Sequence, residues 1–430
     1  MHFVGIGGVG MSGLAEFLVA RGYTVTGSDR TPNDRTKSLA EQGVTIYIGH
    51  DGANVGDAEL VVRTSAVARN NVEIEQANAR NIPVVLREQL LGAVFDSFDT
   101  RIAVCGTHGK TTVTAMIHQV LTSAAVDHAA FIGGVYHGNN YFDGNGTVVA
   151  EACEFNRSFL NLHPTFCVCL NAEHDHPDCY KDEESVRRAF AQFFANVDPN
   201  GCVLLPHVLK NLCVRRKKTI FDKAVGVQNV RLAAGKPSFE ATFADGQTAN
   251  ITLNVVGAHN VYNAQATLAL GEMLRLPRDK MLSGLAAFDG VDRRWTETPC
   301  ALCRTVVDYA HHPTELACSV EAARSLTKGR VLCVFQPHTF SRTRAFWQGF
   351  VDCFKSADAV AYLPVYSARE KPIAGVNSFL LAQTAVKCGL NACFLPDFDS
   401  AACWIRGNAS PNDVLLILGA GDVCQLAQLL

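Results

Sequence analysis

The chain has 430 residues, of which 48% are hydrophobic and 18% charged, and its formal net charge is −3. This length exceeds one ordinary domain of roughly 100–200 residues, and the apolar fraction excludes a disordered chain. The small net charge argues against a general basic surface for nucleic acid, and no apolar run reaches the roughly 18 residues of a membrane span, so we expect neither partner.

The 16 cysteines are scattered through apolar runs, as at Cys105 and Cys333. In such runs we interpret them as small buried hydrophobes of a reducing cytoplasm. Cys300 and Cys303 form a CxxC without a second pair at zinc spacing, and we interpret these as strand cysteines too. An apolar strand follows Met1 with no secretory leader before it, which also favours a cytoplasmic protein.

The first predicted unit of structure is a strand over residues 3–7 followed by a helix. The helix is predicted because four apolar residues recur on one face, and we expect it to end at Arg21 and Gly22. The apolar residues of that face are Met11, Leu14, Phe17 and Leu18.

Between this strand and helix, Gly5, Gly7 and Gly10 form a GxGxxG turn of the kind that binds a pyrophosphate. A second strand is predicted over residues 23–28 and ends at Asp29, at the spacing where an acid meets a ribose. The residues alone favour a nicotinamide dinucleotide first and another nucleotide diphosphate second.

A second strand–turn–helix begins with the apolar residues 102–105. The turn departs from the strict GxxxxGK[ST] pattern because Val104 stands where the first glycine would be. Its amides form an anion nest, Lys110 can reach β- and γ-phosphates, and the Thr111 hydroxyl can bind Mg²⁺. The predicted ATP-binding loop comprises Gly106, Thr107, His108, Gly109, Lys110, Thr111 and Thr112.

Two further predicted strands carry acids and histidines at their ends. Residues 147–150 end at Glu151, and residues 167–170 lead into a loop that contains Glu173, His176 and Asp178. Adjacent parallel strands bring their carboxyl ends together, so Glu151 and His176 can both face the phosphate loop as metal ligands with Thr111. Taken singly, Glu173 and Asp178 are equally explained as solvated loop residues.

The carboxy-terminal part adds four more predicted strands, over residues 306–309, 331–335, 359–363 and 414–418. Strands that alternate with helices predict an α/β fold with mainly parallel sheets, whose ligands bind beyond the carboxyl ends of the strands. We place domain boundaries after residues 91 and 296, which gives three domains over 1–91, 92–296 and 297–430.

Together, eight segments resemble the ATP-dependent Mur ligases of peptidoglycan synthesis. They occur in the order of the family's motifs and span essentially the whole chain. These segments are residues 2–15, 106–112, 151–154, 171–180, 257–264, 290–295, 308–313 and 336–344.

The resemblance implies a Rossmann-like first domain, a P-loop ATPase-like central domain with a mostly parallel sheet, and a Rossmann-like third domain. It implies that L-alanine is joined to the carboxylate of UDP-N-acetylmuramate through an acyl phosphate, with ATP and Mg²⁺, in a cytoplasmic monomer or homodimer. The first domain would then bind UDP rather than a nicotinamide cofactor. The residues implied for UDP binding are Gly7, Gly8, Gly10, Met11, Ser12, Asp29 and Ser65.

The resemblance also assigns roles farther along the chain. Lys110, Glu151, His176 and His312 would be catalytic. Asn260, Asn263 and Asp308 would position adenosine, and Arg294 would reach the phosphates. His312, Arg342 and Arg344 would bind the carboxylate of the incoming amino acid, since arginine supplies bidentate geometry.

The chain also departs from the family pattern. Cys153 replaces an acid of the EADE segment, and Pro177 replaces a common leucine. Residues 183–194 contain arginines but no lysine, so we assign no carbamylated lysine there.

Three alternatives stay open on the sequence. A related ligase would add a preformed peptide or another amino acid, and a pocket distinguishes one methyl group by only roughly 10–200-fold. A nicotinamide-dependent dehydrogenase would leave Lys110, Glu151 and His176 without a task. A nucleotide-sensing module would bind ATP without turnover.

Overall fold

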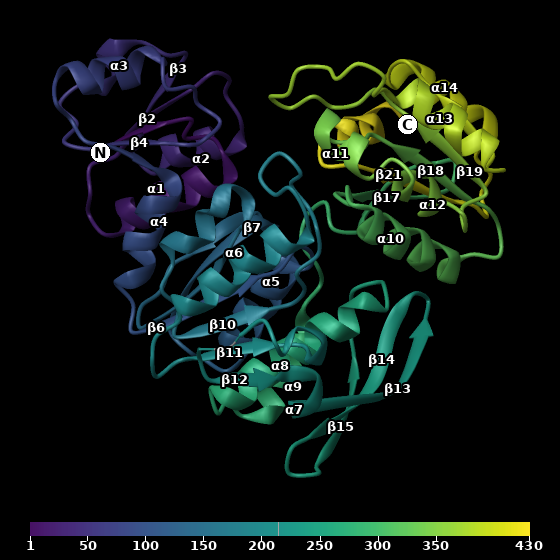
Figure 1. Cartoon of the computed structure of the whole chain (residues 1–430), viewed down its shortest axis with the longest axis horizontal. Coiled ribbons are helices and arrows are strands. Elements are labelled where there is room, and N and C mark those ends of the chain that lie inside the picture. The colour runs from purple at the N-terminus through teal and green to yellow at the C-terminus, as the bar shows by residue number, and fades with distance from the viewer. Residues whose placement is uncertain (214) are drawn as a thin grey trace. The chain divides into compact units, whose positions relative to one another are not determined.

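The computed structural model describes residues 1–213 and 215–430. Their contacts divide them into two compact units. The first unit comprises Met1–Asn171 and Arg188–Ile220, and the second comprises Ala172–Arg187 and Phe221–Leu430. Among the described residues, each unit contains two of the four β-sheets (Figure 1).

The first sheet is wholly parallel, with the strand order β3-β2-β1-β4-β5. Its strands are β1 (His2–Val4), β2 (Thr26–Asp29), β3 (Thr45–Ile48), β4 (Val61–Arg63) and β5 (Val84–Leu86). The helices that connect and follow them are α1 (Val9–Ala20), α2 (Asp34–Glu41), α3 (Val72–Ala79) and α4 (Arg87–Asp96). Because β1 is the central strand, the glycine turn that follows it lies at the middle of the carboxyl edge, where parallel sheets bind ligands.

The second sheet has the order β12-β11-β10-β6-β9-β7-β8 and is parallel except for the hairpin β7–β8. Its strands are β6 (Thr100–Cys105), β7 (His128–Tyr136), β8 (Asn139–Phe142), β9 (Thr147–Glu151), β10 (Phe166–Cys169), β11 (Cys202–Leu205) and β12 (Lys218–Ile220). The two longest helices that follow its strands are α5 (Lys110–Ser123) and α6 (Glu183–Ala195). The strands β9 and β10 flank β6 on either side, so both end next to the turn that follows β6.

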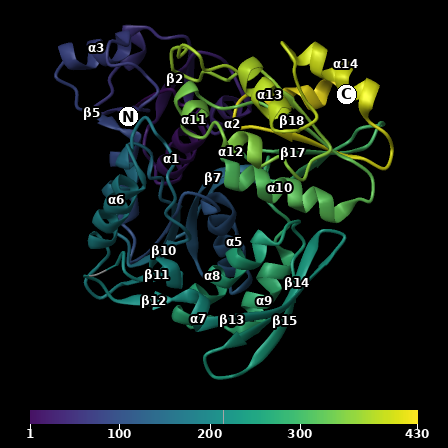
Figure 2. The ribbon, with the colours of Figure 1, turned by 45° about the vertical axis from the view of Figure 1, so that its right-hand side comes forward.

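The second unit contains a small antiparallel ribbon. Its strands are β13 (Val225–Ala233), β14 (Lys236–Phe243) and β15 (Thr248–Thr252), and α7 (Phe221–Ala224) precedes them. The helices α8 (His259–Met273) and α9 (Arg278–Ala287) contact the ribbon (Figure 2).

The last sheet has the order β16-β17-β21-β18-β19-β20 and is parallel apart from the edge strand β16. Its strands are β16 (Thr296–Thr298), β17 (Arg304–Asp308), β18 (Val331–Phe335), β19 (Ala359–Tyr362), β20 (Ala392–Phe394) and β21 (Val414–Leu418). The helices are α10 (Pro313–Leu326), α11 (Phe340–Ala345), α12 (Gly349–Asp352), α13 (Ser378–Lys387) and α14 (Phe398–Asn408). Apolar residues of β18 and β21 are buried on both faces, as parallel strands between helical layers require.

The predicted α/β class with mainly parallel sheets is confirmed, and the strands over 331–335 and 414–418 match residue for residue. The strand predicted over 23–28 instead begins at Thr26. The amide of Tyr23 donates to the carbonyl of Leu18 at 3.0 Å, and Gly22 has a positive φ, as in a glycine-terminated helix. Tyr23 therefore belongs to the end of helix α1, and the strand starts later than predicted. No helix in the described parts of the chain is both long and apolar enough to cross a bilayer. The two predicted domain boundaries, and the three domains that they define, stay a prediction.

A buried histidine pair in the first unit makes stability depend on pH. His118 Nδ1 lies 2.8 Å from His128 Nε2, and both rings are more than nine-tenths buried. Burial, aided by the neighbouring His128, lowers the pKa of His118 to about 4, and burial also lowers the pKa of His128. The His118 ring is therefore neutral in the folded protein near pH 6.

We predict that the free energy of unfolding falls as the pH drops through the window from about 6.5 to about 4. In this window His118 binds a proton in the unfolded chain but stays neutral in the folded protein. The free energy of unfolding is therefore lower by about 1.4 kcal/mol at pH 5.5 than at pH 7.5. Urea denaturation followed by circular dichroism at both pH values measures this loss. In His118→Asn the loss should shrink; an unchanged pH dependence would contradict the assignment.

Candidate active site

The turn after β1 requires glycine at two positions. Gly5 has a φ of +85°, and a Cβ on Gly7 would lie 2.5 Å from Nδ2 of Asn33. Gly7 N donates to Oδ2 of Asp29 at 2.9 Å, so Asp29 holds the turn from the end of β2. The amides of Val9 and Gly10, at the first two helical positions, have no carbonyl partner within the helix. The turn therefore presents donors to an anion.

Three other residues predicted for this site differ in exposure. Met11 and Ser12 are buried, and both their amides donate to the carbonyl of Gly8, so they support the turn from beneath. The hydroxyl of Ser12 donates to the carbonyl of Val9 at 3.1 Å. Ser65 is exposed in the turn after β4, the neighbour of β1.

Arg87, the first residue of α4, also lies at this turn, although no sequence motif marks it. A Cβ on Gly10 would lie 3.1 Å from Cδ and 3.2 Å from Nη1 of Arg87, so this guanidinium lies against the first turn of α1. Arg87 is half-buried and forms no ion pair or hydrogen bond with any described residue. The sequence feature that could have indicated Arg87 is its place directly after strand β5, because the glycine turn lies at the same carboxyl edge of the sheet.

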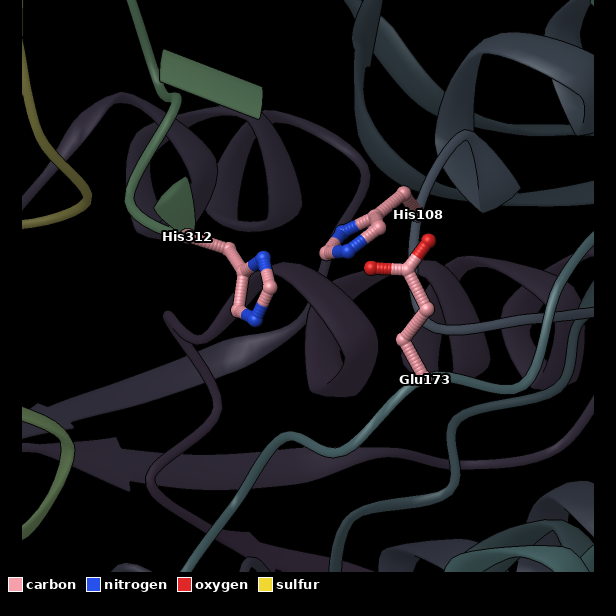
Figure 3. A group of neighbouring side chains, drawn as sticks. All are labelled: His108, Glu173 and His312. Carbon is pink, nitrogen blue, oxygen red and sulfur yellow. The ribbon is translucent and has the colours of Figure 1, made fainter. Parts of the chain in front are cut away.

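The turn between β6 and α5 also depends on glycine, since Gly106 and Gly109 have φ values of +145° and +82°. The amide of His108, whose ring is drawn in Figure 3, donates to Oδ1 of Asn171 at 2.8 Å. Nδ2 of Asn171 returns a hydrogen bond to the carbonyl of His108 at 3.1 Å. Asn171, just beyond β10, thus fixes the shape of the turn.

Lys110 stands at the start of α5 with its side chain only 11% exposed, and all three donors of its ammonium are engaged. Nζ donates to the carbonyls of Gly106 at 2.6 Å and Thr107 at 3.0 Å, and it lies 2.9 Å from Oε2 of Glu154. Burial alone lowers the pKa of Lys110, but the charge of Glu154 outweighs it and holds that pKa above its usual range. Lys110 is therefore a fixed cation, and Glu154 is its partner in this structure.

Thr111 and Glu151, two of the three predicted metal ligands, are in contact. Oγ1 of Thr111 donates to Oε2 of Glu151 at 2.8 Å, and a Cβ on Gly133 would lie only 2.1 Å from that carboxylate oxygen. A hydroxyl and a carboxylate side by side are the oxygen donors that Mg²⁺ prefers. These residues fit a magnesium ion. His176, the third predicted ligand, belongs to the second unit.

In the second unit, Arg342 is buried and holds the loop that follows β10. Its Nε and Nη2 donate to the two carboxylate oxygens of Asp175 at 2.9 and 3.2 Å. Nη1 donates to Nδ1 of His338 at 3.0 Å, and Nη2 lies 3.5 Å from Nδ1 of His176. Burial, reinforced by Arg342, lowers the pKa of His338 to about 4, so its ring can accept this bond. The predicted neighbour Arg344 is exposed on the same helix.

His312 caps α10, where its Nδ1 accepts the amide of Thr314 at 3.3 Å. Its ring is buried and meets the ring of Phe346 edge-on at 4.7 Å between centroids. Glu173 offers a carboxylate oxygen within 4.8 Å of a nitrogen of His312 (Figure 3), and it accepts the hydroxyl of Thr314 at 3.0 Å. From the sequence, Glu173 taken singly was equally explained as a solvated residue of the loop.

The predicted adenosine residues form two separate pairings. Asn263 donates to Oδ1 of Asn260 at 2.9 Å, and both are buried at the start of α8. Asp308 accepts the hydroxyl of Ser319 at 2.7 Å, and burial raises the pKa of Asp308.

The remaining predicted residue, Arg294, stands over the ring of Tyr309 at 4.9 Å and lies 3.7 Å from Glu315.

Comparison with known proteins covers the whole chain. Residues 1–99 match the Mur ligase family, catalytic domain; residues 104–271 match the Mur ligase middle domain; and residues 293–421 match the Mur ligase, glutamate ligase domain. A UDP-N-acetylmuramate–L-alanine ligase of Clostridium novyi is 38% identical over all of this chain and 96% of its own length.

Two solved structures are similar as well. UDP-N-acetylmuramate–alanine ligase MurC from Thermotoga maritima has a TM-score of 0.81 and 28% identity, over 99% of this chain and 97% of its own. A murein peptide ligase from Psychrobacter arcticus has a TM-score of 0.73 over 100% and 96% of the two chains, and at 22% identity it shows the fold alone.

Proposed function

Because the chain belongs to the Mur ligase family, we propose that it joins L-alanine to the carboxylate of UDP-N-acetylmuramate, with conversion of ATP to ADP and phosphate, in peptidoglycan synthesis. One observation carries the proposal: Lys110 and the pair Thr111–Glu151 stand at a phosphate-binding turn of the same unit that contains the glycine turn after β1. The full-length likeness to ligases of this name supports it.

We propose that the first turn binds the UDP of the sugar nucleotide rather than the nicotinamide dinucleotide that the residues alone favoured. The turn suits any pyrophosphate, because a helix N-terminus and glycine amides recognise the anion and not the base. The likeness of the whole chain to relatives named for UDP-N-acetylmuramate supports UDP over a nicotinamide dinucleotide at this turn.

In the proposed reaction, the muramyl carboxylate attacks the γ-phosphate and gives an acyl phosphate, and the amine of alanine then displaces phosphate. The main obstacle is the crowding of negative charge on carboxylate and phosphates. Lys110 would offset that charge from a fixed position. Thr111 and Glu151, with His176, would hold Mg²⁺, which when bound supplies a further positive charge beside the phosphates.

The other roles are part of the same proposal. Gly7, Gly8 and Gly10 would bind the pyrophosphate through their backbone, with Met11 and Ser12 beneath them. Asp29 and Ser65 would stand on the ribose and uracil side. Asn260, Asn263 and Asp308 would position adenosine, and Arg294 would reach the phosphates. His312, Arg342 and Arg344 would bind the carboxylate of the incoming amino acid. Where Arg342 holds Asp175, its contribution includes fixing that loop.

We predict that Arg87→Gln weakens binding of UDP-N-acetylmuramate by about 10- to 100-fold, because a hydrogen bond to a charged partner contributes about 1.5–3 kcal/mol. Isothermal titration calorimetry measures the change. Lys37→Gln removes a cation of the same domain whose side chain is 70% exposed, and it should bind like the parent. Equal affinity of Arg87→Gln and the parent would remove Arg87 from the site.

The decisive experiment for the function is phosphate release from ATP in the presence of UDP-N-acetylmuramate and an amino acid. L-Alanine, glycine, L-serine and a tripeptide are compared, and the mass of the product is confirmed. The proposal expects release that depends on both co-substrates and is fastest with L-alanine. Release that requires the tripeptide would identify a peptide-adding relative instead, and no release with any would reject ligation.

We further propose a cytoplasmic location and a monomer or homodimer. The 16 cysteines of the chain are all free thiols in the structure, which supports a reducing compartment.

A further inference from the structure

Asn140, on strand β8 of the second sheet, reaches the first turn of helix α1. Its Nδ2 donates to the carbonyl of Val9 at 2.6 Å, and its side chain is more than nine-tenths buried. The hydroxyl of Ser12 is close to both groups. Its Oγ donates to the carbonyl of Val9 at 3.1 Å and lies 3.5 Å from Oδ1 of Asn140. Helix α1 contacts both strands of the β7–β8 hairpin.

This approach requires a glycine in the helix. A Cβ on Gly13 would lie 2.9 Å from Nδ2 of Asn140 and 3.2 Å from Cβ of Tyr141. Helix interiors disfavour glycine by roughly 0.5–1 kcal/mol relative to alanine. The helix therefore accepts a residue that weakens it at the place where the strand must come close.

The carbonyl that Asn140 binds belongs to a peptide unit of the pyrophosphate turn. In a trans peptide the carbonyl of Val9 and the N–H of Gly10 are rigidly coplanar and point in opposite directions. A donor on the carbonyl therefore fixes the direction of the Gly10 N–H and polarises it. That N–H lies at the second helical position, where it has no partner within the helix and faces the anion site.

We propose that Asn140 is a positioning residue for the sugar nucleotide. Although it belongs to the ATP-binding part of the chain, it orients and polarises the backbone N–H of the turn that binds the pyrophosphate of the UDP carrier. The inference rests on the function proposed above. It assigns to a residue outside the first domain a share of the affinity for UDP-N-acetylmuramate.

The test compares Asn140→Ala and Asn140→Asp with the matched control Asn139→Ala. Asn139 is the exposed preceding residue of the same strand, so its replacement removes an equal side chain without touching α1. Measured quantities are the dissociation constants of UDP and of UDP-N-acetylmuramate by calorimetry, KM for each substrate, kcat, and the melting temperature.

We expect both Asn140 variants to weaken UDP-N-acetylmuramate and UDP binding by about 10-fold. The KM for ATP and kcat should stay within about twofold of the parent, and Asn139→Ala should resemble the parent. Aspartate keeps the size of asparagine but replaces the donor Nδ2 by an acceptor that repels the Val9 carbonyl, so it should bind no better than alanine.

Three results would overturn the proposal. Unchanged UDP affinity in both variants would separate Asn140 from the turn, and recovery of parental affinity by Asn140→Asp would reduce its role to filling space. A joint fall of melting temperature, kcat and both affinities would make the role purely structural. If the parent itself binds neither UDP nor the sugar nucleotide, the proposed function fails and the inference fails with it; parental binding with unaltered variants rejects the inference alone.

Discussion

Lys110→Ala is expected to reduce the rate of ligation by about 10²–10³-fold while leaving UDP-N-acetylmuramate binding nearly unchanged. That factor is typical for removal of one preorganised electrostatic donor. Lys110 is largely buried, and two loop carbonyls and Glu154 hold its ammonium at the phosphate-binding turn. Phosphate release in the presence of both co-substrates measures the rate, and calorimetry measures binding.

Loss of stability must be separated from loss of chemistry, because Lys110→Ala leaves the buried carboxylate of Glu154 without its cation. The double variant Lys110→Met/Glu154→Gln removes both charges. It should recover the melting temperature and stay inactive, whereas Lys37→Ala, on an exposed helix face, should keep parental activity. Ligation by Lys110→Ala within a few-fold of the parent would reject the proposed role of the lysine.

The second large effect is expected from the buried pair Asp175–Arg342. Asp175→Ala should lower the free energy of unfolding of the second unit by about 3–5 kcal/mol, because it leaves a desolvated guanidinium unpaired. Burial alone raises the pKa of Asp175, but Arg342 outweighs this and holds that pKa far below its usual range. The carboxylate is thus ionised at every pH of interest, and its stabilisation is lost only as the pH falls below about 4.

Urea denaturation followed by tryptophan fluorescence suits this measurement, since Trp295, Trp347 and Trp404 all belong to the second unit. Asp175→Ala/Arg342→Met should be more stable than Asp175→Ala, because it removes the uncompensated charge. Arg344→Ala, two residues along the same helix and exposed, should change stability by no more than about 0.5 kcal/mol. A similar small change in Asp175→Ala would show that the ion pair does not stabilise the fold.

The buried pairings of the site show how far sequence could lead. The sequence indicates that an acid of the segment containing Glu151 and Glu154 lies near the phosphate loop. No spacing rule says which of the two acids contacts Lys110 and which contacts Thr111. The structure pairs Glu154 with Lys110 and Glu151 with Thr111. Asp175 and Arg342 are separated by 167 residues, and their pairing left no local signal.

The chain by itself determined what contiguous residues encode: the α/β class, the two glycine turns and the helices that begin behind them. A strand, a turn with glycines at positive φ and a helix start depend on neighbours in sequence, so local patterns suffice. Only the tertiary structure decided which side chains hold those turns, as Arg87 lies against Gly10 and Asn140 binds the carbonyl of Val9. The order of strands in a sheet sets these contacts, and that order depends on packing between distant segments.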